Sequence, residues 1–116
     1  MNRYRLSKAG ISANAGIERF YGDRELYECS LNKFPKDPHY EMMIKAIGEK
    51  DVKAAFAAAH ALKGLAGNLS MVRLYDHICP LVELLRGGTL EGADELLPAV
   101  VSDYEALTAA LTPTEE

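Results

Sequence analysis

Several sequence features that mark other classes of protein are absent from these 116 residues. The two cysteines, Cys29 and Cys79, have neither metal-ligand spacing nor a disulfide-dense context, so we expect reduced packing residues in a cytoplasmic protein. No stretch approaches the ~20 apolar residues of a membrane span, and the N-terminus has no apolar signal core. A net charge of −4 without any basic run argues against a nucleic-acid surface. We therefore expect a soluble protein that binds neither membranes nor nucleic acids.

Strand-like alternation, internal repeats and low-complexity tracts are also absent. Apolar residues make up 48% and charged residues 26%, as in ordinary globular proteins, and the length suits one domain, residues 1–116, with a single core. The apolar residues recur at helical spacing and the connections are short, which favours antiparallel neighbours. The sequence predicts an all-α fold: an antiparallel up-down four-helix bundle with a short extra N-terminal helix.

Capping residues and glycines indicate where the helices of the first half begin and end. The expected boundaries are a short helix from Ser12 or Asn14 to Tyr21, a second helix capped by Asp23, and a segment from Asp37 and Pro38 to about Gly48. The prolines at 35 and 38 leave two possibilities open, because the second helix is either bent there or divided into two helices.

In the second half, Ser70 is expected to cap a helix that ends near Arg86, and Thr89 to begin the last helix. Pro80 lies inside the first of these helices and Pro98 inside the second. An interior proline removes one backbone hydrogen bond and costs ~3 kcal/mol. We therefore expect a kink or a break near residues 76–79 and a bend at Pro98.

The most informative stretch is residues 51–69, which read as one helix beginning near Asp51. Its apolar residues are spaced alternately three and four apart and form one stripe: Val52, Ala55, Ala59, Leu62, Ala66 and Leu69. At roughly 100° per residue, His60 lies about 130° from the centre of that stripe. The periodicity therefore predicts that His60 points into water.

The residues beside His60 on this helix suit the approach of another protein; they are Phe56, Ala57, Lys63, Gly64 and Gly67. Each glycine costs roughly 1 kcal/mol relative to alanine in a helix interior and leaves bare backbone next to the imidazole. Lys63 shares the helix surface with His60 and supplies a cation for a developing negative charge. Because a neutral imidazole nitrogen is a competent nucleophile, the pattern indicates reversible phosphorylation of His60.

The run His-Ala-Leu-Lys-Gly at residues 60–64, followed by Ala-Gly-Asn-Leu at 66–69, resembles the signature of histidine phosphotransfer (HPt) domains. These domains are the four-helix phosphocarriers of two-component phosphorelays. The resemblance covers most of the chain, with a looser match over residues 10–27. The chain departs from the family at Ser70, where glycine is common, and at Glu83, which is displaced by one residue from the usual acidic position.

The resemblance implies that His60 accepts a phosphoryl group from the aspartate of a response-regulator receiver domain and relays it to another receiver. The other implied roles are charge stabilisation by Lys63, receiver access and docking at Phe56, Ala57, Gly64 and Gly67, and support of the helix end by Asn68. The receiver would supply Mg²⁺, and the partner would be a receiver domain, a hybrid sensor histidine kinase, or both. The chain has no strand followed by a phosphate-cradling glycine loop, so we expect a monomeric phosphocarrier without an ATP site or cofactor of its own rather than an enzyme.

Three other interpretations stay open. A histidine-kinase dimerisation and phosphoacceptor domain also exposes a histidine on a helical bundle, but it usually has an acidic residue where this chain has Ala61. An adaptor could keep the HPt fold and dock on receivers without transferring phosphate. A purely structural bundle is the third interpretation, and it leaves the two glycines unexplained.

The remaining histidines are expected to be structural. His39 follows Pro38 at a helix start and should face solvent, whereas His77 lies near Pro80 and should be partly buried and hydrogen-bonded. The three histidines are not spaced to form a metal site from one helix, so we expect no metal centre.

Overall fold

The computed structural model describes residues 1–112, and within them the chain is helical, without a β-strand. The helices are α1 (Arg3–Lys8), α2 (Ala13–Arg19), α3 (Arg24–Lys33), the 3₁₀ helix η1 (Phe34–Lys36), α4 (His39–Gly48), α5 (Val52–Asn68), α6 (Val72–Arg86) and α7 (Ala93–Leu111). The predicted all-α class is therefore confirmed. No helix in the described part combines the length and the apolar character needed to cross a membrane.

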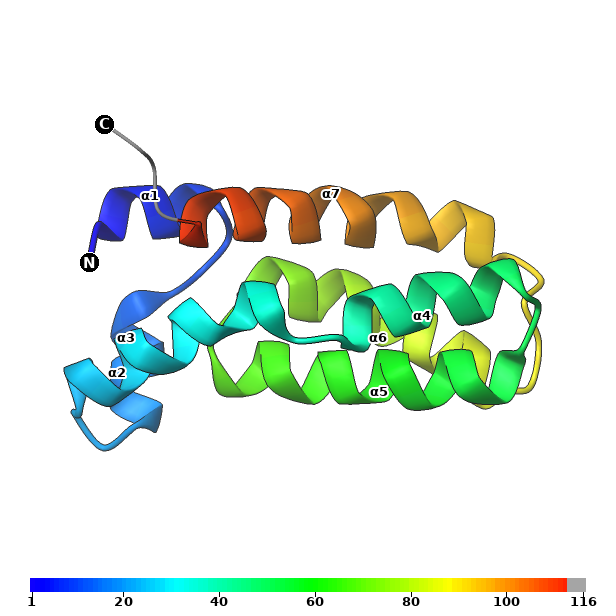
Figure 1. The fold of residues 1–116 in the computed structure, drawn as a ribbon, viewed down its shortest axis with the longest axis horizontal. Coiled ribbons are helices and arrows are strands. Elements are labelled where there is room, and N and C mark those ends of the chain that lie inside the picture. Colours follow the sequence, from blue (N-terminus) through cyan, green and yellow to red (C-terminus); the bar gives the residue numbers. More distant parts are fainter. Residues whose placement is uncertain (113–116) are drawn as a thin grey trace.

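Helices α4 to α7 make up the body of the molecule, and each packs against the next one in the chain. Successive helices run in opposite directions, with α5 in contact with both α4 and α6 (Figure 1). Helices α1 to α3 gather at one end, where α1 lies along the C-terminal part of α7 (Figure 1). Tyr27, Leu31 and Phe34 from this end are fully buried, so one core spans both parts.

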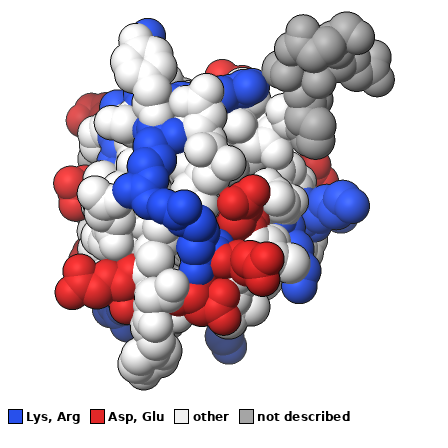
Figure 2. All heavy atoms as spheres, turned by 90° about the vertical axis from the view of Figure 1, so that its left-hand side faces the viewer, with Lys and Arg blue, Asp and Glu red and all other residues white. Residues whose placement is uncertain are grey.

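The end formed by α1 to α3 has both signs of charge. Figure 2 shows this face, where Lys and Arg side chains form a band across the middle and Asp and Glu side chains lie beside it. Arg3 and Arg24 lie here with Glu28 around one depression. Arg24 is exposed and forms no ion pair within residues 1–112. The face is therefore mixed in charge rather than uniformly basic.

The helix with His60 forms for reasons visible in its sequence. Asp51 is the N-cap residue of α5, and its carboxylate accepts a hydrogen bond from the Ala54 amide at 3.1 Å. The predicted stripe is buried except for Val52, which is half-buried. Apart from Leu62, the buried residues within α5 are alanines, which are small enough to let α5 pack closely between its neighbours. The predicted helix and its buried face are confirmed.

The first-half boundaries agree with the sequence at α3 and differ at α4. Asp23 caps α3, and its carboxylate accepts from the Leu26 amide at 3.0 Å, as predicted. The open question at the prolines is settled, because η1 separates α3 from α4. Asp37 accepts from the His39 amide at 2.9 Å, and α4 begins at His39 with Pro38 as the N-cap residue. The start is therefore one residue later than predicted.

Two short helices, not one, precede α3. Helix α2 follows Ser12 as predicted, although the Ser12 side chain makes no capping hydrogen bond. Helix α1 was not predicted, since Leu6 is the one buried residue in it and a single apolar residue produces no periodicity. The Arg5 guanidinium anchors α1 on α7 by donating to the Ala109 carbonyl at 2.8 Å.

The prediction that Ser70 caps the helix after α5 is wrong. Ser70 has a left-handed backbone, with φ +56°, and it closes α5 instead. The Ser70 and Met71 amides donate to the carbonyls of Gly67 and Ala66 at 3.3 and 2.9 Å, and Met71 is the N-cap residue of α6. Glycine suits this conformation better than serine, because a Cβ disfavours left-handed backbone.

The break considered at Pro80 is absent, because α6 continues through it, and α7 likewise continues through Pro98. Both prolines are exposed, so the carbonyls that lose an N–H partner can bond to water. The last helix begins at Ala93 rather than at Thr89, because Gly92 turns the chain with φ +94°. Thr89 instead accepts a hydrogen bond from the Glu91 amide at 3.0 Å in the preceding loop.

Helix α2 and Tyr27 are fastened to the turn between α5 and α6. The Ser12 amide donates to the Ser70 carbonyl at 2.9 Å. The buried Tyr27 hydroxyl donates to the Leu69 carbonyl at 2.7 Å. Gly16 of α2 lies directly on the Tyr27 side chain, where a Cβ would approach two ring carbons and the hydroxyl oxygen to 2.1–2.3 Å. The position of α2 relative to the C-terminal end of α5 is therefore fixed by packing and by hydrogen bonds.

Tyr27 should give the protein a characteristic loss of stability at high pH. Burial raises the pKa of Tyr27 from 10.0 to about 12, because the phenolate would lose its hydration in the interior. In the unfolded chain the phenol ionises near its ordinary value, whereas the folded protein keeps it neutral. The stability that the neutral phenol contributes is therefore complete below pH 10 and lost as the pH rises to about 12. The loss is on the order of 2 kcal/mol.

The Tyr27→Phe variant tests this expectation. At pH 8 the variant should be less stable than wild type by about 1 kcal/mol, because the hydrogen bond to Leu69 is lost. Between pH 10 and 12 the advantage of the wild type should disappear and then reverse, since only the wild type has this phenol to ionise. Urea unfolding of both proteins over this range measures the difference. Free energies of unfolding that stay parallel would contradict the assignment.

Candidate functional site

His60 lies in the middle of α5 with its side chain exposed. Neither of its ring nitrogens hydrogen-bonds to another residue within 1–112, whereas Nδ1 of each of the other two histidines contacts a carboxylate. The Phe56 ring, one turn earlier, lies beside the imidazole, with 5.6 Å between the ring centroids. Both nitrogens are therefore open to an incoming reagent, while one side of the ring has an aromatic neighbour. The predicted exposure of His60 is confirmed.

In each of the other two histidines, the Nδ1 atom of the ring contacts a carboxylate. His39 Nδ1 lies 2.9 Å from Asp37 Oδ1, and the side chain is 36% exposed, so it is less exposed than predicted. His77 Nδ1 lies 2.5 Å from Oδ2 of the buried Asp103 on α7, which confirms the predicted hydrogen bond. The predicted partial burial of His77 is wrong, because its side chain is 46% exposed. The described residues contain no group of three or more histidine, cysteine or acidic side chains that could hold a metal ion.

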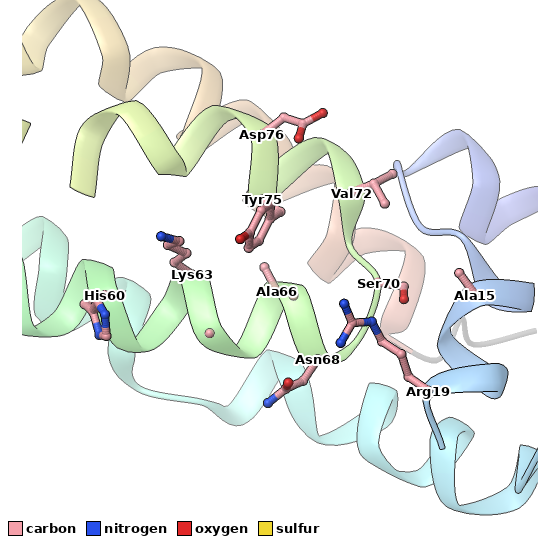
Figure 3. Close-up of a pocket in the computed structure, with 12 residues that line it drawn as sticks. Ala15, Arg19, His60, Lys63, Ala66, Asn68, Ser70, Val72, Tyr75 and Asp76 are labelled. Carbon is pink, nitrogen blue, oxygen red and sulfur yellow. The ribbon is translucent and has the colours of Figure 1, made fainter. Parts of the chain in front are cut away.

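Lys63 lies on the same side of α5 as His60, but its ammonium is directed toward α6. Its Nζ lies 5.9 Å from the centroid of the Tyr75 ring, an arrangement typical of a cation–π contact (Figure 3). The lysine stem is long and has rotatable bonds, so the ammonium can leave this position for a nearby anion. Its role in phosphoryl transfer stays a prediction.

The two glycines beside His60 have different surroundings. A Cβ at Gly64 would meet no atom within 4 Å, so nothing inside the protein requires glycine there. A Cβ at Gly67 would lie 3.2 Å from Cε2 of Tyr75, so the missing side chain at Gly67 lets α6 approach α5 closely. The packing of α6 against α5 accounts for glycine at position 67. No contact inside the described structure accounts for glycine at position 64, so the close approach of a partner is the remaining reason for it.

The remaining neighbours form an apolar edge next to His60. Phe56 is half-buried and packs against the core, and Ala57 is exposed. The Arg86 guanidinium, at the end of α6, lies over the Phe56 ring at 5.0 Å from its centroid. The contact of Arg86 could not be predicted from the sequence, because no local pattern relates Arg86 to Phe56, thirty positions earlier.

A groove of about 520 Å³ begins at His60 and follows α5 toward its C-terminal end. Lys63 and Gly64 line it from α5, Tyr75 lines it from α6, and Arg19 reaches it from α2 at the end far from His60 (Figure 3). The structure thus brings the predicted residues His60, Lys63, Gly64 and Gly67 to one groove. Phe56 and Ala57 are not among its lining residues.

Asn68, which was predicted to support the helix end, lines the same groove. Its side chain has no hydrogen-bond partner in the part of the chain that the structure describes, and α5 ends on backbone hydrogen bonds instead. Tyr75 and Arg19 are groove residues that the sequence analysis missed. No signal along the chain could have found them, since each comes from a different helix and meets α5 only through folding.

Comparison with known protein families gives one finding. A family model described as the Hpt domain matches residues 37–110, which comprise α4 to α6 and nearly all of α7. No curated protein and no solved structure matches the chain significantly. Helices α1 to α3 therefore lie outside the part of the chain that the family model matches.

Proposed function

Because this chain belongs to the Hpt domain family, we propose that it is a phosphorelay carrier that accepts a phosphoryl group on His60 from a receiver-domain aspartate. It then passes the group to the aspartate of another receiver. The observation that supports this most strongly is the contrast among the histidines. The His60 ring is exposed and free of hydrogen bonds to the described residues, whereas Asp37 and Asp103 each hold Nδ1 of one of the other two rings.

The proposed transfer needs no reagent beyond the two proteins, and every bond and electron pair is accounted for. The lone pair of one imidazole nitrogen forms a bond to phosphorus, and the bond between phosphorus and the aspartate oxygen breaks. The aspartate leaves as a carboxylate with that electron pair, and the other imidazole nitrogen keeps its proton. Such a reaction depends mainly on alignment and on charge stabilisation. The return step to a second receiver is the same reaction in reverse.

The chain supplies the nucleophile and the docking surface in this proposal. Lys63 moves from Tyr75 to the phosphoryl oxygens, and Gly64 admits the partner to the backbone beside His60. The receiver supplies Mg²⁺, and the partner is a receiver domain, a hybrid sensor kinase, or both. The carrier acts as a cytoplasmic monomer without an ATP site. The antiparallel packing of α4 to α7 supports assigning the fold as an up-down four-helix bundle.

The test is to locate the phosphoryl group on the wild-type chain. The protein is incubated with phosphorylated receiver domains, digested at alkaline pH and mapped by tandem mass spectrometry. We expect one acid-labile, alkali-stable phosphoryl group, on His60. A phosphoryl group on His39 or His77 would refute the assigned site. No phosphoryl group from any receiver that binds would refute transfer and favour the adaptor interpretation.

A further inference from the structure

Arg19 gives the His60 groove a cation that lies outside the matched family region. It is the last residue of α2, it is exposed, and it lines the groove at the end near Asn68 and Ser70. In Figure 3 its guanidinium extends from α2 toward the C-terminal end of α5. The family model matches from residue 37 onward, so Arg19 lies outside the matched part of the chain.

Side-chain packing fixes the position of α2, and therefore of the Arg19 backbone, relative to His60. Gly16 leaves no space between α2 and the Tyr27 ring. Phe20, the next residue after Arg19, packs edge-on against the same ring, with centroids 5.4 Å apart. Tyr27 is in turn bonded to the end of α5 through its hydroxyl. A contact made by Arg19 is therefore made at a defined distance from His60.

That distance keeps Arg19 away from the reacting atoms. The eight residue steps of α5 from His60 to Asn68 span about 12 Å, at 1.5 Å per step. A group on the partner that meets Arg19 therefore lies on the partner's surface beside its active site. Arg19 would act on binding, not on the chemical step.

The charges of the groove indicate the chemistry of that group. Arg19 forms no ion pair within the described residues, and the other cation of the groove, Lys63, lies over an aromatic ring. Asp76 is the one acidic residue among the lining residues, although the whole chain has a net charge of −4. Val72 and Tyr75, which also line the groove, are 49% and 37% exposed. An exposed apolar surface with an unpaired arginine at its end is typical of a protein–protein interface.

We propose that Arg19 is a specificity-determining residue, which selects receiver domains that present a carboxylate opposite it when they dock on His60. This inference rests on the proposed function for the identity of the partner. It adds that recognition extends past the Hpt-matched part of the chain to α2. Receivers with a neutral or basic residue at that point would bind less tightly, even though their active sites are the same.

The test compares two charge reversals, Arg19→Glu and Arg24→Glu, against receiver domains of the source organism that bind the wild-type chain. Arg24 is a matched control because it is exposed, unpaired and outside the groove. We expect Arg19→Glu to raise Kd and KM about tenfold or more, with the larger change at low salt, and to change kcat much less. Arg24→Glu should keep the wild-type affinity. An acidic-to-arginine change on the receiver should restore binding of Arg19→Glu.

The outcomes separate this inference from the proposed function. Equal effects of the two reversals, or no effect of either on Kd, would overturn the role of Arg19. A fall in kcat without a change in KM would also overturn it, since Arg19 would then act on the chemical step. Calorimetric Kd values need no transfer, so they decide the role of Arg19 even if the bound receivers leave His60 unlabelled. In that case the proposed carrier function fails while the docking inference is judged on its own.

Discussion

Replacing His60 with glutamine is expected to abolish phosphoryl transfer from a phosphorylated receiver, by at least about a thousandfold. The glutamine amide is close to imidazole in size but offers no nucleophilic nitrogen. Since His60 is exposed and makes no hydrogen bond within the described residues, the change should alter the free energy of unfolding by less than about 0.5 kcal/mol. Loss of label with unchanged stability and unchanged receiver binding would establish His60 as the acceptor.

His39→Gln is the matched control for this experiment. It removes an imidazole at a helix start, where the ring contacts Asp37, and it should leave the transfer rate near the wild-type value. His77→Gln should also keep transfer, although the loss of its contact with the buried Asp103 should lower stability. Label that persists on His60→Gln and disappears from either control would move the acceptor to that histidine.

Replacing Gly64 with glutamine should make the protein more stable and much less active. A Cβ at this position meets no atom within 4 Å, so the substitution should gain up to about 1 kcal/mol from the better helix propensity of glutamine. The same side chain would occupy the space through which a receiver approaches His60, and we expect transfer to slow about a hundredfold. Thermal unfolding and the initial rate of transfer, measured on the same preparation, check the two opposite effects.

Ala54→Gln is the control for the added bulk. Ala54 is also exposed on α5, near its N-terminal end and outside the groove, so this variant should transfer phosphate at the wild-type rate. Should Gly64→Gln be stabilised and fully active, the open space at Gly64 would have no part in docking. Equal losses in both variants would point to a general effect on α5.

The sequence alone predicted correctly those features of the fold that depend on residues close together in the chain. The apolar stripe of α5 and the Asp51 cap are local, and they placed His60 on the exposed face. The cap of α3 by Asp23 is local in the same way. The expected reaction, phosphoryl transfer, came from the family resemblance, because helical periodicity alone does not indicate a reaction.

Predictions failed where backbone geometry or distant contacts decide the outcome. Ser70 is a good capping residue by type, but the chain needs a left-handed residue there to leave α5. The break considered at Pro80 does not occur, because Pro80 lies on an exposed face where water can replace the lost hydrogen bond, and the composition of the segment does not reveal that exposure. Arg19 and Tyr75 reach the groove from two other helices, and their positions follow from tertiary packing.

The contact between Tyr27 and Leu69 shows that part of the hydrophobic core lies outside residues 37–110, which the family model matches. A fragment limited to residues 37–110 would have the Leu69 carbonyl without its phenol donor and would expose the core surface that Tyr27, Leu31 and Phe34 cover. Excision at the family boundary would therefore cut through a hydrophobic interior rather than between two modules. We therefore expect an autonomously folding fragment to need the residues before 37, because the end of α5 is held by Tyr27, which lies outside the matched range.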